Sequence, residues 1–297
     1  MRKVKIITDS CADLNAEQLQ RYDIDFASMS TSCDGVESVA SLTWTENEVH
    51  DHYNKMRDGK RIITAQVAGT EFTRIFEKYL EKGMDIVYIG CSSRSSGSVN
   101  TGFVIANRLM EAYPESKIIC IDSLNASMGI GMLAIEAAKM ANDGASAAEI
   151  EAHILAIRKK VNQYVTVHSL DALKRAGRVK ASSAFLGNLM GVKPILISDA
   201  NGDVVAYKKV KGRQKSFEEI VALLKESMIE PEKQVVYLTH ADCEREEIEE
   251  LIALIKQEIP CRGVEVGYIG PIIGASIGPD AVGIWGFGRE VTYKNGD

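Results

Sequence analysis

The sequence has little proline, few aromatic residues and no long apolar run. Of its 297 residues only 6 are proline, 6% are aromatic, 45% are hydrophobic and 26% are charged. This composition excludes a collagen-like chain, a disordered chain and a coiled coil. No apolar stretch reaches the ~18 residues that a bilayer-spanning helix needs, and the first residues run directly into a strand pattern without a leader segment. We therefore expect a cytoplasmic protein without a membrane span.

The sequence also lacks an excess of positive charge and any clustering of cysteine. Lys and Arg number 35 against 41 Asp and Glu, a net charge of −6. A general nucleic-acid binder carries a basic excess, so we expect no nucleic-acid partner. The 6 cysteines contain no Cys-x-x-Cys pair and no Cys/His cluster at zinc spacing. Free thiols and the absence of a metal site are the expectation.

What is present in the first 160 residues is a regular alternation of short β-branched runs with amphipathic stretches of helical length. The runs predict strands at 4–8, 24–29, 61–64, 85–90 and 117–121. Repeated strand, helix, strand order predicts a parallel sheet with crossover helices. Capping boxes are expected to open three helices, at Thr45-x-x-Glu48, Ser146-x-x-Glu149 and Ser216-x-x-Glu219.

After about residue 160 the pattern changes. Strand-like runs at 194–198 and 203–209 flank Asp199-Ala-Asn-Gly202, whose Asn-Gly suits a hairpin turn. Two helical stretches and a glycine-rich tail over 263–288 follow. This mixture predicts a smaller α+β domain in the second half of the chain.

Short polar segments follow several predicted strands. They are Thr8-Asp9-Ser10, Thr64-Ala65-Gln66, the serine-rich loop 91–97 and Asp122-Ser123. Ligands bind at that edge of an open parallel sheet, so the four segments predict a site. Asp9 and Asp122 also fit the simpler role of helix caps. The serines offer uncharged donors, which suit a carboxylate or a phosphate.

Two motif matches fail on their context. The letters Gly129-Ile-Gly131-Met-Leu-Ala134 fit a dinucleotide fingerprint but begin several residues after their strand, so we interpret the glycines as helix-packing positions. Gly274-Ala-Ser276-Ile-Gly278 fits the hydrolase nucleophile elbow, but no histidine follows it and a proline replaces the expected helix. There is no Walker phosphate loop either.

The histidines leave an enzyme as an alternative. His168 and His240 end predicted strands, where a general base is plausible. His50, His52 and His153 lie in predicted helices with polar neighbours and are expected at the surface. An enzyme acting on a small phosphorylated or carboxylated metabolite therefore stays open, as does a sensor of an acyl ligand.

Seven short motifs follow one another along nearly the whole chain. They are Thr8-Asp9-Ser10-x-x-Asp13-Leu14, Thr64-x-Gln66, Ser92-Ser93-x-x-Ser96-Gly97, Asp122-Ser123, Leu173-Lys-Arg-Ala-Gly177-Arg178-Val179, Lys193-Pro194-Ile195, and Ile269-Gly270-Pro271 leading to Gly278-Pro279. Each motif alone is weak. In this order they make the chain resemble the DegV family of bacterial fatty-acid-binding proteins, which partner fatty acid kinase.

The resemblance implies a fold and a function. The fold is an N-terminal three-layer α/β/α domain with a mainly parallel sheet, residues 1–160, and a C-terminal two-layer α+β domain with a mixed sheet, residues 161–297. One long-chain fatty acid of C16 to C18 would lie between the domains, with no other cofactor and no catalytic centre in the chain itself. A fatty acid kinase subunit would phosphorylate the bound carboxyl group. Transient contact with a membrane is compatible with ligand loading.

The resemblance also assigns residues to roles. The ligand carboxylate would be held by Thr64, Ser93, Ser96 and Ser276. Supporting positions near the ligand would be Asp9, Ser10, Ser92, Gly97, Asp122, Ser123 and Gly274. Docking of the kinase would use Arg178, Lys211 and Arg213, which belong to two basic segments at 174–180 and 208–215. A solvated surface is the simpler interpretation of those segments.

Three positions depart from the family pattern. The family T-S-Q-P is Thr64-Ala65-Gln66-Val67 here, the family G-G-R is Ala176-Gly177-Arg178, and Ser276 replaces the family histidine. A serine donates one hydrogen bond but cannot become a cation. Arg94, in the serine loop, is a candidate to compensate, with a solvent-facing side chain as the equal alternative.

Overall fold

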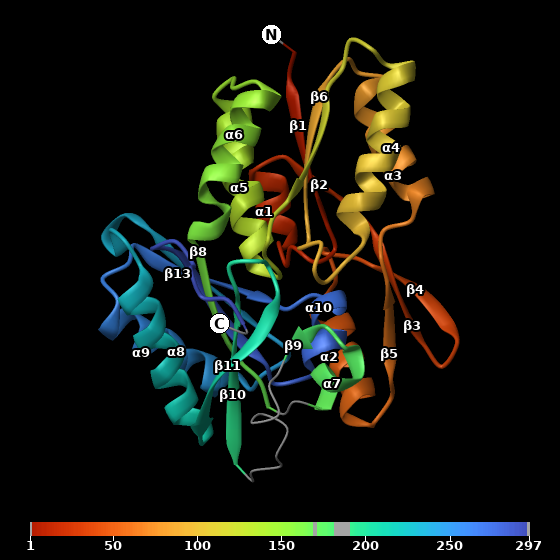
Figure 1. The fold of residues 1–297 in the computed structure, drawn as a ribbon. Helices are drawn as coiled ribbons and strands as arrows, with labels where there is room; N and C mark the ends of the chain where they lie inside the picture. The colour runs from red at the N-terminus through yellow and green to blue at the C-terminus, as the bar shows by residue number, and fades with distance from the viewer. Residues whose placement is uncertain (1, 169–170, 181–190, 296–297) are drawn as a thin grey trace.

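The structure, a computed structural model, describes residues 2–168, 171–180 and 191–295 and builds them around three β-sheets (Figure 1). The strands are β1 (Val4–Asp9), β2 (Ile24–Ala27), β3 (Met29–Cys33), β4 (Val36–Ala40), β5 (Ile62–Ala65), β6 (Asp85–Gly90), β7 (Ile118–Asp122), β8 (Val161–Thr166), β9 (Val179–Lys180), β10 (Val192–Ser198), β11 (Val204–Lys211), β12 (Val235–His240), β13 (Gly263–Tyr268) and β14 (Val282–Phe287).

The helices pack around these sheets. They are α1 (Ala16–Arg21), α2 (Glu46–Arg57), α3 (Gly69–Leu80), α4 (Ser98–Ala112), α5 (Met128–Asn142), α6 (Ala147–Ile157), α7 (Asp171–Ala176), α8 (Arg213–Ser227), α9 (Arg245–Glu258) and α10 (Pro271–Ile277), with 3-10 turns at Arg158–Lys160 and Pro231–Lys233. Among the described residues, no helix combines the length and apolar character needed to cross a membrane. All 6 cysteines are free, as predicted.

The first sheet is parallel, with strand order β2-β1-β6-β7. Helices α3 and α4 cover one face and α5 and α6 the other, which gives the expected three layers (Figure 1). The predicted strand at 24–29 is wrong in one respect, because the chain leaves this sheet at Ser28 and begins β3. The Ser28 N–H donates to the Glu71 carboxylate at 3.1 Å instead of to a strand.

The second sheet is antiparallel, with order β4-β3-β5, and it holds the predicted strand at 61–64. That strand was expected in the parallel sheet and is an edge strand of this small one. Thr64 pairs with Thr31, two residues from Met29. Because side chains alternate along a strand, Thr64 and Met29 face the same side.

The third sheet is mixed, with order β13-β12-β14-β8-β10-β11-β9. The predicted hairpin joins β10 and β11, and Gly202 takes the left-handed φ of 83° that its turn requires. Helices α8 and α9 cover one face, against residues such as Tyr164 and Ile284. The alternate residues, including Gln163 and Trp285, face away from those helices.

Two of the three predicted capping boxes form. The Thr45 and Ser146 side chains each accept from the backbone of the glutamate three residues later. The prediction of a capping box at Ser216 is wrong, because α8 begins earlier, at Arg213, after Gly212 with a φ of 94°. The Ser216 hydroxyl donates back to the Arg213 carbonyl at 2.6 Å inside the helix.

The short helix α10 is fixed by two buried hydrogen bonds. The Asp13 carboxylate accepts from the Gly270 N–H at 2.9 Å and from the Ser127 hydroxyl. The Tyr53 hydroxyl donates to the Ile269 carbonyl at 2.6 Å. Burial raises the pKa of Asp13 to about 7, against the two hydrogen bonds that lower it.

The Asp13→Asn variant tests the contribution of the Asp13 carboxyl group to stability. A carboxyl group with a raised folded-state pKa loses stability as the pH rises from its unfolded pKa toward the folded value, here from about 4 to about 7. Asparagine keeps the acceptor for Gly270 and does not titrate. We expect the difference in unfolding free energy, variant minus wild type, to grow by an amount on the order of 3 kcal/mol between pH 5 and 7.5. Urea titrations at both pH values measure it, and a difference independent of pH would contradict the assignment.

Candidate functional site

A cavity of about 180 Å³ lies where the three sheets meet α10. Most of its wall is apolar: Met29, Ala126, Val165, Leu173, Leu196, Val204, Ile269, Ile272, Ile273, Ile277 and Trp285. An engineered cavity of ~150 Å³ with such a lining binds benzene. The interior is therefore roomy and apolar enough for an aliphatic group.

Polar side chains gather where this cavity approaches the surface. Apart from the buried Ser127 and Gln163, the polar side chains of the wall are half-buried or exposed and come from β5 and the residue after it, the serine loop after β6, the residue before β9, and α10: Thr64, Gln66, Ser95, Ser96, Arg178 and Ser276. We call this end the mouth. Apart from Arg178 these groups are uncharged, so the mouth offers hydroxyl and amide donors to an anion.

The hydroxyls at the mouth differ in what they already bind. The Ser96 and Ser98 hydroxyls share a 2.9 Å hydrogen bond. The Ser276 hydroxyl donates to the Ile272 carbonyl of its own helix at 3.5 Å. The Ser95 hydroxyl oxygen is buried and, among the described residues, has no hydrogen-bond partner. A buried hydroxyl without a partner is costly, which makes Ser95 a candidate donor to a ligand.

Of the four residues expected at the carboxylate, the structure places Thr64, Ser96 and Ser276 in the cavity wall. Ser93 is elsewhere: its hydroxyl donates to the Asp122 carboxylate at 2.5 Å, and its N–H donates to the same side chain. Among the described residues that line the cavity, Ser93 is absent. Through these two hydrogen bonds Ser93 fixes the serine loop to Asp122.

Most of the residues expected to support the ligand form hydrogen bonds within the protein that hold the loops in place. The Ser92 hydroxyl donates to the Gly202 carbonyl at 2.7 Å, and Ser123 and Asp122 hold the turn that follows β7. Gly97 lines the cavity, and a Cβ there would lie 2.1 Å from the Gln66 side-chain oxygen. At Gly274 a Cβ would lie 2.3 Å from the Tyr53 hydroxyl, so only glycine allows α10 to approach α2.

Asp9 and Asp122 do not cap helices, which corrects that interpretation. Asp9 is fully buried and accepts from the Tyr88 hydroxyl and from the N–H groups of Cys91 and Cys11, at 2.7, 3.0 and 2.9 Å. Burial raises its pKa although these bonds favour the charged form. Asp9 thereby ties the loops after β1 and β6 together at the cavity wall.

The sequence placed the segments 64–66 and 91–97 at the site, but it assigned no individual role to Ser95, Gln66 or a pair of thiols that the structure finds there. Cys11 and Cys91 both line the cavity. A hydrogen bond to Cys91, then burial, raises the pKa of Cys11 far above its usual value, so the thiol is neutral. The serine run was the signal for Ser95, but the pattern alone did not tell which hydroxyls point inward.

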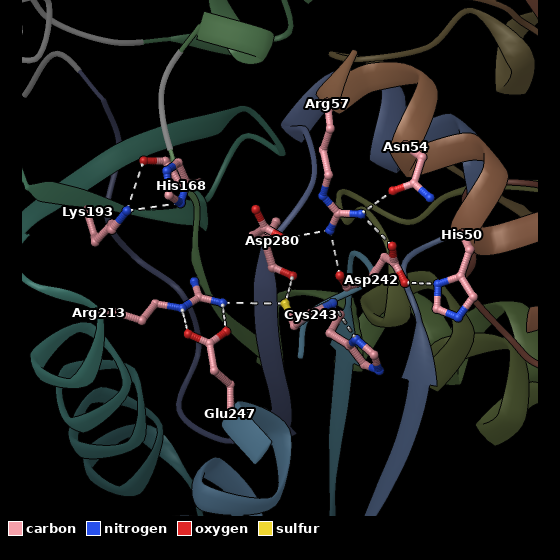
Figure 2. Close-up of polar contacts among 12 residues, drawn as sticks. His50, Asn54, Arg57, His168, Lys193, Arg213, Asp242, Cys243, Glu247 and Asp280 are labelled. Carbon is pink, nitrogen blue, oxygen red and sulfur yellow. Dashed lines mark hydrogen bonds and ion pairs between the residues drawn. The ribbon is translucent and has the colours of Figure 1, made fainter. Parts of the chain in front are cut away.

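The two candidate catalytic histidines lie in a different cluster, at one end of the third sheet, where His240 ends β12. Figure 2 shows His168 in this cluster. His168 contacts the Lys193 ammonium at 3.1 Å, and burial together with that charge lowers its pKa. His240 accepts from the Cys243 N–H at 3.2 Å, and burial lowers its pKa to about 4. Neither histidine is among the described residues that line the cavity.

The same cluster joins α2 to the third sheet. Arg57 bridges Asp242 at 2.6 Å and Asp280 at 2.7 Å, and His50 also contacts Asp242 (Figure 2). The expectation that His52 lies at the surface is wrong. It packs between Trp44 and Tyr53, with ring centroids 5.5 and 5.1 Å away, and burial lowers its pKa to about 4.

The basic residues expected to dock a partner are separated. Arg178 is exposed at the mouth and donates to the Ala176 carbonyl, and Lys211 is exposed at the end of β11. Arg213 is paired with Glu247 at 3.1 Å (Figure 2), and Arg94 is held by Asp203 at 3.3 Å and is not among the described residues of the cavity wall. The side chain of Lys174, also in the basic segment, lies outside the described part of the chain.

The known proteins that are similar to this chain belong to one family. A family model described as "Uncharacterised protein, DegV family" matches residues 3–287. A DegV domain-containing protein of Clostridium perfringens is 33% identical over 288 residues, 97% of this chain and 98% of that protein. A DegV lipid binding protein of Thermotoga maritima superposes with a TM-score of 0.85 at 26% identity, covering 98% of this chain and 100% of that chain. A second T. maritima protein, described as revealing fatty acid binding function, has a TM-score of 0.85 at 25% identity and covers 97% and 100%.

Two serine variants distinguish a hydroxyl that stabilises the fold from a hydroxyl at the candidate site. The buried Ser10 hydroxyl donates to the Ala40 carbonyl at 2.6 Å and accepts from the Met29 N–H at 2.9 Å. Ser10→Ala should cost about 2 kcal/mol of unfolding free energy, because it leaves buried backbone groups unpaired. Ser95→Ala breaks no internal bond and should cost less than about 0.5 kcal/mol. Chemical denaturation compares them, and equal losses would refute the division.

Proposed function

The chain belongs to the DegV family, and from that premise we propose that it carries one long-chain fatty acid. The acyl chain lies in the cavity between the first 160 residues and the rest of the chain, which we take as two domains. The carboxylate rests at the mouth, where a partner kinase reaches it. The observation that supports this is a mainly apolar cavity whose half-buried and exposed polar groups lie at the mouth, with Ser127 and Gln163 buried elsewhere in its wall.

The binding energy comes from the tail. Burying methylenes at ~0.8 kcal/mol each gives on the order of 12 kcal/mol for a C16 chain before the costs of association and ordering. Hydrogen bonds to the head group add little net energy by comparison. The mouth therefore orients the carboxylate more than it retains the ligand.

The head group is assigned to Thr64, Ser96 and Ser276, with the unpartnered Ser95 hydroxyl as an added donor. Ser93 supports this loop through Asp122. Uncharged donors suit a carboxylate that must react, because a fixed cation in direct contact would lower its nucleophilicity. The serine at 276 thus remains compatible with binding.

The chemistry belongs to the kinase in this proposal. A carboxylate oxygen of the bound fatty acid attacks the γ-phosphorus of ATP, and the bond from that phosphorus to the β–γ bridging oxygen breaks. The products are acyl phosphate, still on the carrier, and ADP. This chain holds the tail, excludes water from it and orients the carboxylate. Its histidines lie apart from the cavity, which favours a carrier over an enzyme.

Filling the cavity tests the carrier role. Ala126 is half-buried in the cavity wall, and Ala126→Phe places a ring in the space assigned to the tail. We expect palmitate affinity to fall at least thirtyfold in delipidated protein, followed by tryptophan fluorescence, to which Trp285 in the cavity wall and Trp44 both contribute. Ala112→Phe, at the exposed end of α4, is the matched control and should bind as wild type does. Unchanged affinity in Ala126→Phe would contradict this location for the ligand.

Removing head-group donors tests presentation. The double variant Thr64→Ala, Ser96→Ala should keep palmitate affinity within about threefold, because the tail supplies the energy. With ATP and the fatty acid kinase subunit of the same organism, we expect acyl hydroxamate, formed when hydroxylamine traps acyl phosphate, to fall at least tenfold. Thr70→Ala, exposed at the start of α3, is the control. Full product formation by the double variant would overturn the head-group assignment.

A further inference from the structure

Two polar side chains lie in the cavity wall outside the mouth. Ser127 and Gln163 line the cavity, and each keeps only 5% of its surface exposed. Ser127 is the residue before α5, and Gln163 lies in the middle of β8. These two elements are in contact, because Gly129 of α5 packs closely against Val161 of β8. We call Ser127 and Gln163 the inner polar groups.

The order of the strands separates Gln163 from the mouth. Arg178 of the mouth immediately precedes β9, the edge strand of the third sheet, and β10 and β11 lie between β9 and β8. Three strand spacings of about 4.8 Å make about 14 Å. An extended alkyl chain with bonds of about 1.5 Å at angles of about 111° covers that distance in roughly 11 bonds. A fatty acid whose carboxylate lies at the mouth would therefore bring the middle of its chain to Gln163.

Both inner polar groups keep an unused hydrogen-bonding position. The Ser127 hydroxyl donates to the Asp13 carboxylate, and within the described part of the chain no donor reaches its oxygen. The Gln163 amide donates one N–H to the Ser198 hydroxyl at 2.7 Å, and its oxygen accepts from the Trp285 N–H at 3.2 Å. The second N–H of this amide has no partner among the described residues. The wall therefore offers one acceptor and one donor.

The backbone at Ser127 is one that serine seldom adopts. Its φ of 56° and ψ of −143° lie in a region that favours glycine. Glycine would relieve this strain, so the hydroxyl is what a serine contributes at this position. Strained residues of this kind cluster at ligand sites.

We propose that the inner polar groups bind a hydroxyl group in the middle of the acyl chain, so that the protein prefers a mid-chain hydroxy fatty acid to the unsubstituted acid. A hydroxyl group can donate one hydrogen bond and accept others. It donates to the Ser127 oxygen and accepts from the second N–H of Gln163. The inference rests on the proposed function, since the acyl chain must occupy this cavity.

A purely structural role is the simpler explanation, because Ser127 binds Asp13 and Gln163 binds Trp285. It accounts for the bonds that the two side chains already make. It does not account for a spare acceptor and a spare donor on buried side chains that line the same mainly apolar cavity. A tail made only of methylene groups leaves both unpaired, and buried unpaired groups are costly. A ketone could accept from Gln163 but could not donate to Ser127.

The test compares three acids with the same C18 chain on delipidated full-length protein: stearate, 12-hydroxystearate and 12-oxostearate. Isothermal titration calorimetry measures each dissociation constant. We expect 12-hydroxystearate to bind at least threefold more tightly than stearate, and more tightly than 12-oxostearate. A wall without hydrogen-bond partners would weaken binding of the hydroxy acid instead, because its hydroxyl group would lose water without replacement.

Stearate bound as tightly as 12-hydroxystearate, or more tightly, would overturn the proposal. An oxo acid bound as tightly as the hydroxy acid would refute the acceptor role of Ser127. Wild-type protein that is folded and binds none of the three acids would refute the carrier role itself.

Variants locate the hydroxyl site. Gln163→Leu and Ser127→Gly each remove one inner polar group, and glycine suits the positive φ at position 127. In each we expect the preference for 12-hydroxystearate over stearate to disappear or reverse. Gln257→Leu makes the same chemical change on the exposed surface of α9, which covers the other face of the third sheet, and should keep the wild-type preference. Circular dichroism checks that each variant is folded. A threefold preference that persists in either folded variant would refute the site.

Discussion

The position of α10 is the constraint on which the site depends. This helix supplies Ile272, Ile273, Ser276 and Ile277 to the cavity wall, so it contributes both apolar lining and one of the head-group hydroxyls. It is only 7 residues long, and a helix this short is marginal in isolation. Two buried hydrogen bonds fix it against the first half of the chain: the Gly270 N–H donates to the Asp13 carboxylate, and the Tyr53 hydroxyl donates to the Ile269 carbonyl.

The charges around the site are arranged by depth. Buried carboxylates at Asp9 and Asp13 accept hydrogen bonds from loop backbones and hold the walls, whereas the mouth has hydroxyl and amide groups and Arg178 as its one described cation. Burying an unpaired cation beside the tail would cost more than a hydroxyl does. The arrangement keeps cations out of the apolar part of the cavity and leaves Arg178 at its mouth.

Much of the fold was predictable from sequence because local signals agreed with tertiary structure. Buried β-branched runs marked β1, β6 and β7, the Asn-Gly turn marked the hairpin at Gly202, and two capping boxes formed. The errors have tertiary causes: Glu71, distant in sequence, ends β2 at Ser28, and Gly212 starts α8 before the Ser216 box can act. At the site, motif order pointed to Thr64, Ser96 and Ser276. It did not tell that Ser93 turns to Asp122 while Ser95 faces the cavity, because neighbouring serines in a loop have no periodicity that fixes their direction.

The central claim is that an aliphatic tail occupies the interior of this protein. The most direct test is mass spectrometry of an organic extract from the denatured, purified protein after growth with long-chain lipids. The account predicts close to one equivalent of a C16 to C18 fatty acid per chain. Protein that is folded and yields no fatty acid, even after incubation with excess palmitate and removal of the unbound fraction, would contradict it.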